Sequence, residues 1–462
     1  MNRRDFLFKT VAGVNLSLLS PGLFAGRAPA SSWKSYDFRP FREGQFPAPV
    51  VQVTPDDGFY IHTFYDVCPW SPSGKMLTLT RLPYQGKKPA WGATAGVCLV
   101  DLQNRRIREV YRTRAWSFQL GANVQWDSVS DRYLYTNDII NGEVVCVRID
   151  LAHEEVRMFA GPKYDISPDG RSAISPNLLN MNIHQYGYAV PDGPGGRPVP
   201  FTRGDMENEG LWHTDLETDT KRILVPMNRF FETADDKDRY AGSIGYLFHS
   251  KFNRQHTRIL QVFRAQIGDK GRNASLFSMN TDGSGLTQCL TAARWNQIAL
   301  SGGSGNHPNW HPDGEHVIMN CVPTWMGFRE MMFCRFRCDG SGFTVLSEKH
   351  RGSGHPSMEP SGRYLVADAY PKQSYVSSGV GEVAIRMLDT RDDTELRLCN
   401  IPNDVGGGVR QSRAGDAVSG GSHYKLDPHP AWSRDYRQLC FNGAPGGQRQ
   451  VFIADLKKVT GS

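Results

Sequence analysis

The chain has 462 residues, and its 53 Lys and Arg residues exceed its 47 Asp and Glu residues to give a formal net charge of +6. Hydrophobic residues make up 39% of the sequence, and 47 glycines and 28 prolines are spread among mixed charges, as in a turn-rich globular protein. This composition excludes a coiled coil, a disordered chain and a bundle of membrane-spanning helices, and its mild basicity does not require a nucleic-acid partner.

The first residues have the pattern of an export signal. Arg3 and Arg4 precede a moderately apolar stretch, and small residues at 28–30 form an A-x-A cleavage site. A chance pair of arginines before a first core segment is the alternative. We expect residues 1–30 to be a twin-arginine signal peptide, residues 31–462 to form one domain, and the mature protein to be periplasmic or secreted.

Nine cysteines are scattered along the chain, most of them in apolar runs typical of strands. A free cysteine in such a run packs as a small hydrophobic residue, so no disulfide framework is expected. Cys321, Cys334 and Cys338 could instead form a metal site with His311. They lack the short C-x-x-C spacing of zinc sites, which favours core packing.

A short unit occurs seven times and consists of an apolar or aromatic anchor, a turn and an alternating apolar strand. The anchors are Trp70, Trp126, Ile166, Phe252, Trp310, Met358 and Trp432. Pro, Asp or Ser, and Gly after the anchor are typical of type I turns, which join antiparallel strands. Seven such units, at spacings of roughly 40 to 85 residues, predict an all-β fold, a seven-bladed β-propeller. Two β-sandwich domains or a parallel β-helix would leave seven equivalent turns unexplained.

The last unit ends after its third strand, near residues 450–456. The fourth strand must then come from elsewhere, and the N-terminal segment near residues 49–54 is the available candidate. Closing the ring in this way removes an exposed sheet edge.

The position three residues before each anchor should line the central channel of the propeller. Along the chain it holds Val67, Asn123, Lys163, His249, His307, His355 and His429. Four histidines in four consecutive units could bring their ring nitrogens together on one divalent ion, such as Zn, Mn or Ca. The equally weighted alternative is a structural repeat in which each histidine bonds to the neighbouring backbone or to a channel water.

The longest connection between second and third strands lies in the third unit, from about residue 175 to residue 210. It carries Asn180, Asn182, His184, Gln185, Tyr186, Tyr188, Arg197 and Arg203. Long loops with such side chains usually bind a ligand, although a cap held by Tyr and His packing is the alternative. The substrate-binding residues that we expect near this face are Asn137, Tyr186, Lys163 and Arg264.

These amide, arginine, histidine and tyrosine side chains suit an acidic polysaccharide. Cleavage of a 4-linked uronate by β-elimination needs a group that neutralises the carboxylate, a base for the C5 proton and an acid for the departing O4. Hydrolysis would need two opposed carboxylates, whereas Asp205, Glu207 and Glu209 lie together in one stretch. The sequence has no G-x-S-x-G, H-E-x-x-H, P-loop or dinucleotide-binding motif, so no organic cofactor is expected.

Five segments resemble the seven-bladed ulvan lyases and, more distantly, the oligogalacturonate lyases. They are residues 59–74 (FYIHTFYDVCPWSPSG), 120–138 (LGANVQWDSVSDRYLYTND), 185–191 (QYGYAVP), 307–314 (HPNWHPDG) and 427–432 (DPHPAW). The resemblance covers nearly the whole chain after the signal peptide.

The resemblance implies a polysaccharide lyase in which Tyr188 and Arg203 act with a histidine of the second unit. Together with the side chains available at this face, it predicts that Arg203 and Asn123 hold the carboxylate and that Tyr188 and His184 handle the protons. Asn123 stands where the ulvan lyases have a histidine, so the base would be His184 or Tyr188. The substrate would be an ulvan-type or other uronate-containing polymer. A non-catalytic propeller that binds glycans or docks a partner is the alternative, because it needs the same basic pocket without a base and an acid.

Overall fold

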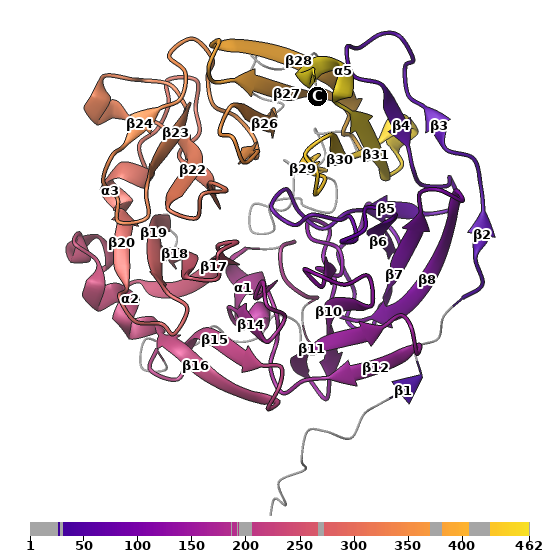
Figure 1. The fold of residues 1–462 in the computed structure, drawn as a ribbon. Coiled ribbons are helices and arrows are strands. Elements are labelled where there is room, and N and C mark those ends of the chain that lie inside the picture. Colours follow the sequence, from indigo (N-terminus) through magenta and orange to yellow (C-terminus); the bar gives the residue numbers. More distant parts are fainter. Residues whose placement is uncertain are drawn as a thin grey trace, which may run out of the picture.

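The computed structural model describes residues 26–27, 31–185, 187–191, 193, 206–266, 272–369, 381–405 and 426–461. Seven antiparallel sheets, here called blades 1 to 7 in chain order, stand around a common centre (Figure 1). The predicted all-β, seven-bladed β-propeller is therefore confirmed.

Blades 1 to 4 each use four consecutive strands, from the innermost to the outer edge. Blade 1 has β5 (Phe59–Ile61), β6 (Met76–Leu82), β7 (Ala95–Asp101) and β8 (Arg106–Thr113). Blade 2 has β9 (Gln125–Trp126), β10 (Tyr133–Ile140), β11 (Glu143–Asp150) and β12 (Glu155–Met158). Blade 3 has β13 (Asp165–Ile166), β14 (Ser172–Ser175), β15 (Gly210–Asp215) and β16 (Thr220–Pro226). Blade 4 has β17 (Ile244–Phe252), β18 (Arg258–Gln266), β19 (Arg272–Asn280) and β20 (Thr287–Leu290).

Blades 5 and 6 follow the same order. Blade 5 has β21 (Asn306–Trp310), β22 (His316–Cys321), β23 (Met332–Arg337) and β24 (Thr344–Val345). Blade 6 has β25 (Ser357–Met358), β26 (Tyr364–Asp368), β27 (Glu382–Asp389) and β28 (Thr394–Pro402). The short helices among the described residues lie between or after strands, namely α1 (Leu178–His184), α2 (Met227–Thr233), η2 (Lys237–Tyr240), α3 (Ala292–Trp295), η3 (Thr324–Met326), η4 (Pro445–Gly447) and α5 (Lys457–Thr460).

Blade 7 joins both ends of the chain. Its C-terminal strands are β29 (Ala431–Trp432), β30 (Gln438–Gly443) and β31 (Gln450–Asp455). The next strand is β4 (Val50–Gln52), which pairs antiparallel with β31, so the predicted closure by an N-terminal strand is confirmed. The preceding segment adds β3 (Arg39–Pro40) to blade 7, β2 (Lys34–Ser35) to blade 1 and β1 (Gly26–Arg27) to blade 2, along their outer edges (Figure 1).

The aromatic anchors explain how neighbouring blades pack. Three of them donate an indole N–H to a main-chain carbonyl of the preceding blade: Trp126 to that of Pro69, after β5, at 2.9 Å, and Trp310 and Trp432 to those of Lys251 and Ser357, both at 3.2 Å. An indole suits this place because it combines a large apolar surface with one polar donor. The repeated anchor is therefore the contact between blades.

The cysteines pack as expected. All nine are free and eight of them are buried. Cys321, Cys334 and Cys338 belong to the largest hydrophobic cluster, which agrees with core packing for these three. Among the described residues, no helix is both long enough and apolar enough to cross a membrane.

Candidate functional site

A segment of blade 1 fills the middle of the ring. Phe64, Tyr65 and Asp66 follow β5 and reach across the channel to blade 4, where Lys251 Nζ lies 2.5 Å from Asp66 Oδ2. The same ammonium group donates to the Tyr65 hydroxyl at 3.1 Å and to a main-chain carbonyl at 2.8 Å. Both charged side chains are almost fully buried, at 6% and 8% exposure. Tyr65, Asp66 and Lys251 are called the channel clasp below.

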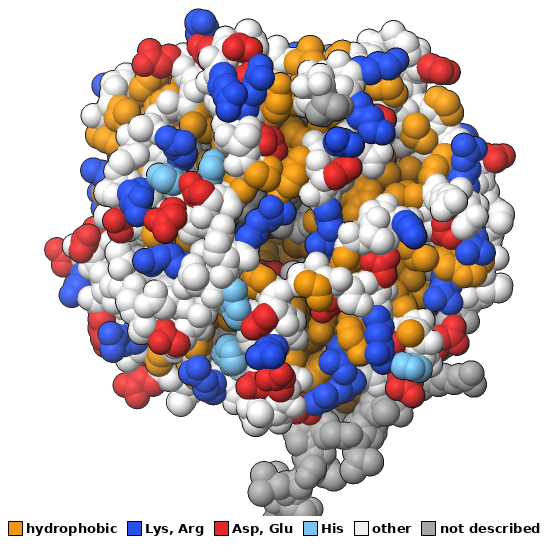
Figure 2. All heavy atoms as spheres, in the orientation of Figure 1, with side chains coloured by type: hydrophobic (Ala, Val, Ile, Leu, Met, Phe, Trp, Pro, Cys, Tyr) orange, Lys and Arg blue, Asp and Glu red, His pale blue; other side chains and the backbone are white. Residues whose placement is uncertain are grey.

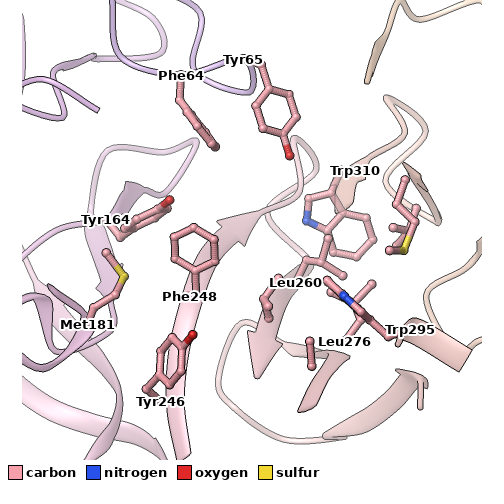
Figure 3. Close-up of a cluster of buried hydrophobic side chains, with 14 of the residues drawn as sticks. Phe64, Tyr65, Tyr164, Met181, Tyr246, Phe248, Leu260, Leu276, Trp295 and Trp310 are labelled. Carbon is pink, nitrogen blue, oxygen red and sulfur yellow. The ribbon is translucent and has the colours of Figure 1, made fainter. Parts of the chain in front are cut away.

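The four predicted histidines lie next to one another around Phe64. The ring centroids are 6.3 Å apart for His249 and His307, 3.9 Å for His307 and His355, and 4.3 Å for His355 and His429. The Phe64 ring lies 5.1 Å from His249 and 4.4 Å from His429. Figure 3 shows Phe64 and Tyr65 reaching into the same space as Tyr164 and Phe248. The shared register thus brings the histidines together, although their role as metal ligands stays a prediction.

The backbone accounts for part of this register. Asn123, His249, His307 and His429 adopt left-handed conformations, with φ of 47°, 55°, 54° and 52°. Asn and His are enriched in this conformation, which other residues with a side chain rarely adopt. In blade 6 the left-handed residue is instead Gly354, one position before His355, with φ of 63°. The repeated His and Asn therefore also meet a structural requirement.

A group of donors suited to a metal ion lies at one side of Phe64. His355, Asp427 and His429 are buried, and their ligand atoms lie within 4.8 Å of one another; in the part of the chain that the structure describes, no other group of His, Cys, Asp and Glu side chains meets this criterion. His355 Nδ1 lies 2.8 Å from the carboxylate of Asp368, which accepts its proton and leaves the Nε2 lone pair available. His307, whose ring is tilted by 34° to that of His355, likewise donates through Nδ1 to the Gly354 carbonyl at 2.9 Å. Imidazole nitrogens with a carboxylate oxygen fit manganese or zinc.

His249 is not part of this donor group, although its ring centroid also lies near that of Phe64, at 5.1 Å. Its exposure is 1%, and neither ring nitrogen has a hydrogen-bond partner among the described residues. Burial lowers the pKa of His249 well below its usual value, and the nearby Lys251 ammonium lowers it further. His249 is therefore a neutral imidazole, and the same burial and the Lys251 charge disfavour its protonated form.

Arg264 and Tyr188 lie beside His249. The Arg264 guanidinium, on β18, lies 4.7 Å from the centre of the Phe248 ring and donates to the Gln185 amide oxygen at 2.5 Å. The half-buried Tyr188 ring meets Phe248 edge-on at 5.4 Å and Phe64 at 6.3 Å. These contacts bring a cation and a phenol next to the neutral imidazole.

The loop that carries Tyr188 is held at its base by Glu209. The helix α1 begins after Asn177, whose side chain accepts from the main chain of Leu179 and Asn180. Glu209, just before β15, accepts from the side-chain amides of Asn177 and Asn180 at 2.7 Å and 2.9 Å. The two ends of the long connection are thereby tied together.

Three predicted residues make contacts between blades. The Asn123 amide donates to the Tyr164 carbonyl at 3.2 Å, and the Asn137 amide pairs with the main-chain N–H and C=O of Lys163 at 2.9 Å and 2.8 Å. Lys163 is fully buried, and its ammonium has no hydrogen-bond partner among the described residues. Burial lowers the pKa of Lys163 to about 8. Substrate contacts by these residues stay predictions.

Other predicted residues fall outside the described part of the chain. Arg203 and Tyr186 lie outside the described residues, and so does the side chain of His184, although its backbone belongs to α1. Their roles therefore stay predictions.

A separate cavity of about 150 Å³ opens on the side of the turns that follow the anchors. Its lining includes Asp165, Trp310 and Trp432, together with Phe64 and Tyr65. Because the last two also contact the histidines, they separate the cavity from the donor group. Figure 2 shows a hollow at the centre of one face of the ring, with Lys and Arg side chains beside it.

The chain is similar in fold to solved propeller structures, although its sequence has no close match. No protein-family model matches the chain, and no curated protein matches its sequence. An oligogalacturonate lyase solved in complex with manganese superposes with a TM-score of 0.61 at 14% identity, covering 92% of this chain and 97% of the other. The oligogalacturonate lyase of Vibrio parahaemolyticus gives a TM-score of 0.59 at 14% identity, covering 93% and 99%. The chain shares their fold. A closer likeness to ulvan lyases stays an expectation from the sequence.

Sequence reasoning missed two acidic residues of the site. Asp427 lies two positions before His429, and such spacing puts two side chains on the same side of an extended segment, which was the available signal. Asp368 reaches the histidines from the second strand of blade 6, at the end of β26.

Proposed function

We propose that this protein is a lyase that cleaves uronate-containing oligosaccharides or polysaccharides by β-elimination. The observation that carries the proposal is the buried donor group of His355, Asp427 and His429, with the neutral His249 and His429 both in contact with the Phe64 ring. The shared fold with oligogalacturonate lyases supports it and favours a short acidic oligosaccharide as the substrate. The ulvan-type substrate rests on the sequence resemblance alone.

His355, Asp427 and His429 would hold a divalent cation, with His307 beside them. Two imidazoles and a carboxylate suit manganese or zinc better than calcium, which prefers oxygen ligands alone. One of the structural neighbours is a manganese complex, which agrees with this donor set. When bound, the cation would supply positive charge for the substrate carboxylate.

The protein side chains would perform the remaining steps. Arg264 would pair with the uronate carboxylate, which makes the C5 proton more acidic. His249 would take that proton, the electron pair would form the C4–C5 double bond, and the C4–O4 bond would break. Tyr188 would give its proton to the departing O4. This arrangement assigns the base to His249, whereas the sequence-based roles of Arg203, Asn123 and His184 remain predictions.

A substrate screen tests the proposal. Purified protein, stripped with a chelator and then given Mn²⁺ or Zn²⁺, is incubated with oligogalacturonides, polygalacturonate, ulvan and alginate. We expect at least one substrate to yield the near-ultraviolet absorbance of a 4,5-unsaturated uronate, and we expect the His249→Gln variant to lose it. No unsaturated product from any uronate substrate with the metal-loaded protein would contradict the lyase proposal.

The burial of the histidines favours a second candidate, a propeller that binds acidic glycans without cleaving them. None of the four histidines is more than 6% exposed, and Phe64 lies among them. This candidate predicts that uronate oligomers bind equally well to the wild type, His249→Gln and Tyr188→Phe, with no bond cleavage. Calorimetric titration of the three proteins with the same oligomer separates the two candidates.

We also propose that the twin-arginine pattern at Arg3 and Arg4 directs export to the periplasm or beyond. Cleavage after Ala30 would remove β1 (Gly26–Arg27), which pairs with blade 2 through only two residues, and would leave the other strands of that blade in place. N-terminal sequencing of the exported protein tests this. A mature chain that still begins at Met1 would contradict it.

A further inference from the structure

One side-chain position joins neighbouring blades around the ring. In each blade the anchor pairs with a residue of the second strand, and the position lies three residues after that partner. It is polar in five blades: Thr80, Asn137, Asn320, Asp368 and Asn442. This position is called the blade clamp below. Comparing the blades shows which contacts the clamp usually makes and that blade 6 differs from the others.

Asparagine clamps bond to the main chain of the following blade. Asn137 pairs with both main-chain groups of Lys163, at 2.8 Å and 2.9 Å. Asn320 donates to the Gly354 carbonyl at 2.6 Å. In each case the amide N–H₂ group meets a carbonyl oxygen, which is the acceptor that it needs.

Blade 6 has a carboxylate at the clamp. Asp368, which is 1% exposed, accepts from the main-chain N–H of His429 at 3.1 Å, so it still joins blade 6 to blade 7. It also accepts from the main-chain N–H of His355 at 2.7 Å and from the Nδ1 of the same residue at 2.8 Å. All three partners are donors. An amide would have one oxygen for these three donors and would turn its N–H₂ group toward them, whereas a carboxylate accepts all three.

The backbone beside Asp368 fits this contact closely. A Cβ atom on Gly354 would lie 2.0 Å from the Asp368 carbonyl oxygen and 2.2 Å from its carboxylate, so only glycine allows this approach. Gly354 also takes the left-handed conformation in place of the residue after it. The shift brings the N–H of His355 to the carboxylate.

We propose that Asp368 is a positioning residue for the divalent-cation site. By accepting the Nδ1 hydrogen bond, it holds His355 in the tautomer whose lone pair is on Nε2, and by accepting the His429 N–H it fixes the backbone of the second ligand. The inference depends on the proposed cation site, but not on the lyase chemistry.

The substitution Asp368→Asn tests it, because asparagine is the clamp residue of blades 2, 5 and 7. The matched control is Asp138→Asn, a buried aspartate next to the clamp of blade 2 that accepts from the Tyr111 hydroxyl at 2.8 Å and the Arg114 main chain at 2.9 Å. Removing such an outer partner of a metal ligand typically costs 10–100-fold in affinity. We expect this loss of Mn²⁺ or Zn²⁺ affinity in Asp368→Asn and none in Asp138→Asn, as measured by calorimetric titration.

The tautomer of His355 is a second readout, and its measurement in the wild type does not depend on the stability of any variant. In the metal-free wild type, ¹⁵N NMR of the imidazole rings should show His355 protonated at Nδ1, and Asp368→Asn should weaken that preference. A wild-type His355 protonated at Nε2, full cation affinity in Asp368→Asn, or no cation binding by the wild type overturns the inference. Cation affinity that depends on Asp368 without cleavage of any polymer supports the inference while refuting the lyase.

Discussion

The buried channel clasp is where one substitution should destabilise the ring most. Lys251→Met removes an ammonium that lies 2.5 Å from Asp66 and also bonds to Tyr65. Asp66 would be left at 8% exposure without its cation. Breaking a buried ion pair from one side typically costs about 3–5 kcal/mol, so we expect Lys251→Met to lose that much unfolding free energy. The Tyr65 ring lies 5.2 Å from His355, so cation affinity should fall as well.

A double-mutant cycle measures the clasp. Guanidinium unfolding of Lys251→Met, Asp66→Asn and the double variant should show that the double variant loses less than the sum of the two, because it leaves no isolated charge. The control is Arg337→Met, which breaks an exposed ion pair of 2.7 Å to Glu315 and should cost at most about 1 kcal/mol. Additive losses, or a Lys251→Met loss no larger than that of the control, would refute the reasoning.

Three further predictions concern individual side chains. Burial lowers the pKa of Lys163 from 10.5 to about 8, so the unfolded chain binds this proton more tightly and the contribution of Lys163 to stability should rise between pH 8 and 10.5. In denaturant titrations the stability of the wild type relative to Lys163→Met should therefore rise over this range, and a difference that does not change with pH would contradict this. His249→Gln should lower lyase turnover by roughly 10²–10⁴-fold while calorimetry finds unchanged cation affinity, whereas an equal loss of both would make His249 a ligand. Arg203→Ala and Tyr188→Phe should each lower turnover by about 10²–10³-fold with an unchanged circular dichroism spectrum, and full turnover would reject their roles.

The fold was predictable because its signals are local. The anchor and its turn lie within a few residues of each other, and turn chemistry such as that of Asp313 and Gly314 depends on neighbours in sequence. The closing strand of blade 7 was predictable from the same repeat, because the last unit ends after its third strand and its blade needs a fourth. The histidine register was also readable, since one position recurs in each unit.

The site was predictable only in part. His355 and His429 belong to the donor group, but His249 does not, and Asp427 completes it. Nothing in the spacing of the repeats shows that blade 1 sends an aromatic segment through the channel. The division of the histidines between a donor group and a lone base follows from that segment.

The sequence by itself determined the blades, their order and the strand that closes the ring, because strand periodicity and turn chemistry act between residues that are close along the chain. Only the tertiary structure decided which side chains meet in the channel. Asp66 and Lys251, or Asp368 and His429, come from different blades, and a contact of about 3 Å between them depends on how the closed ring brings those blades together. The position of a residue in the repeat predicts that it faces the channel axis, but it does not predict which side chain the residue contacts there.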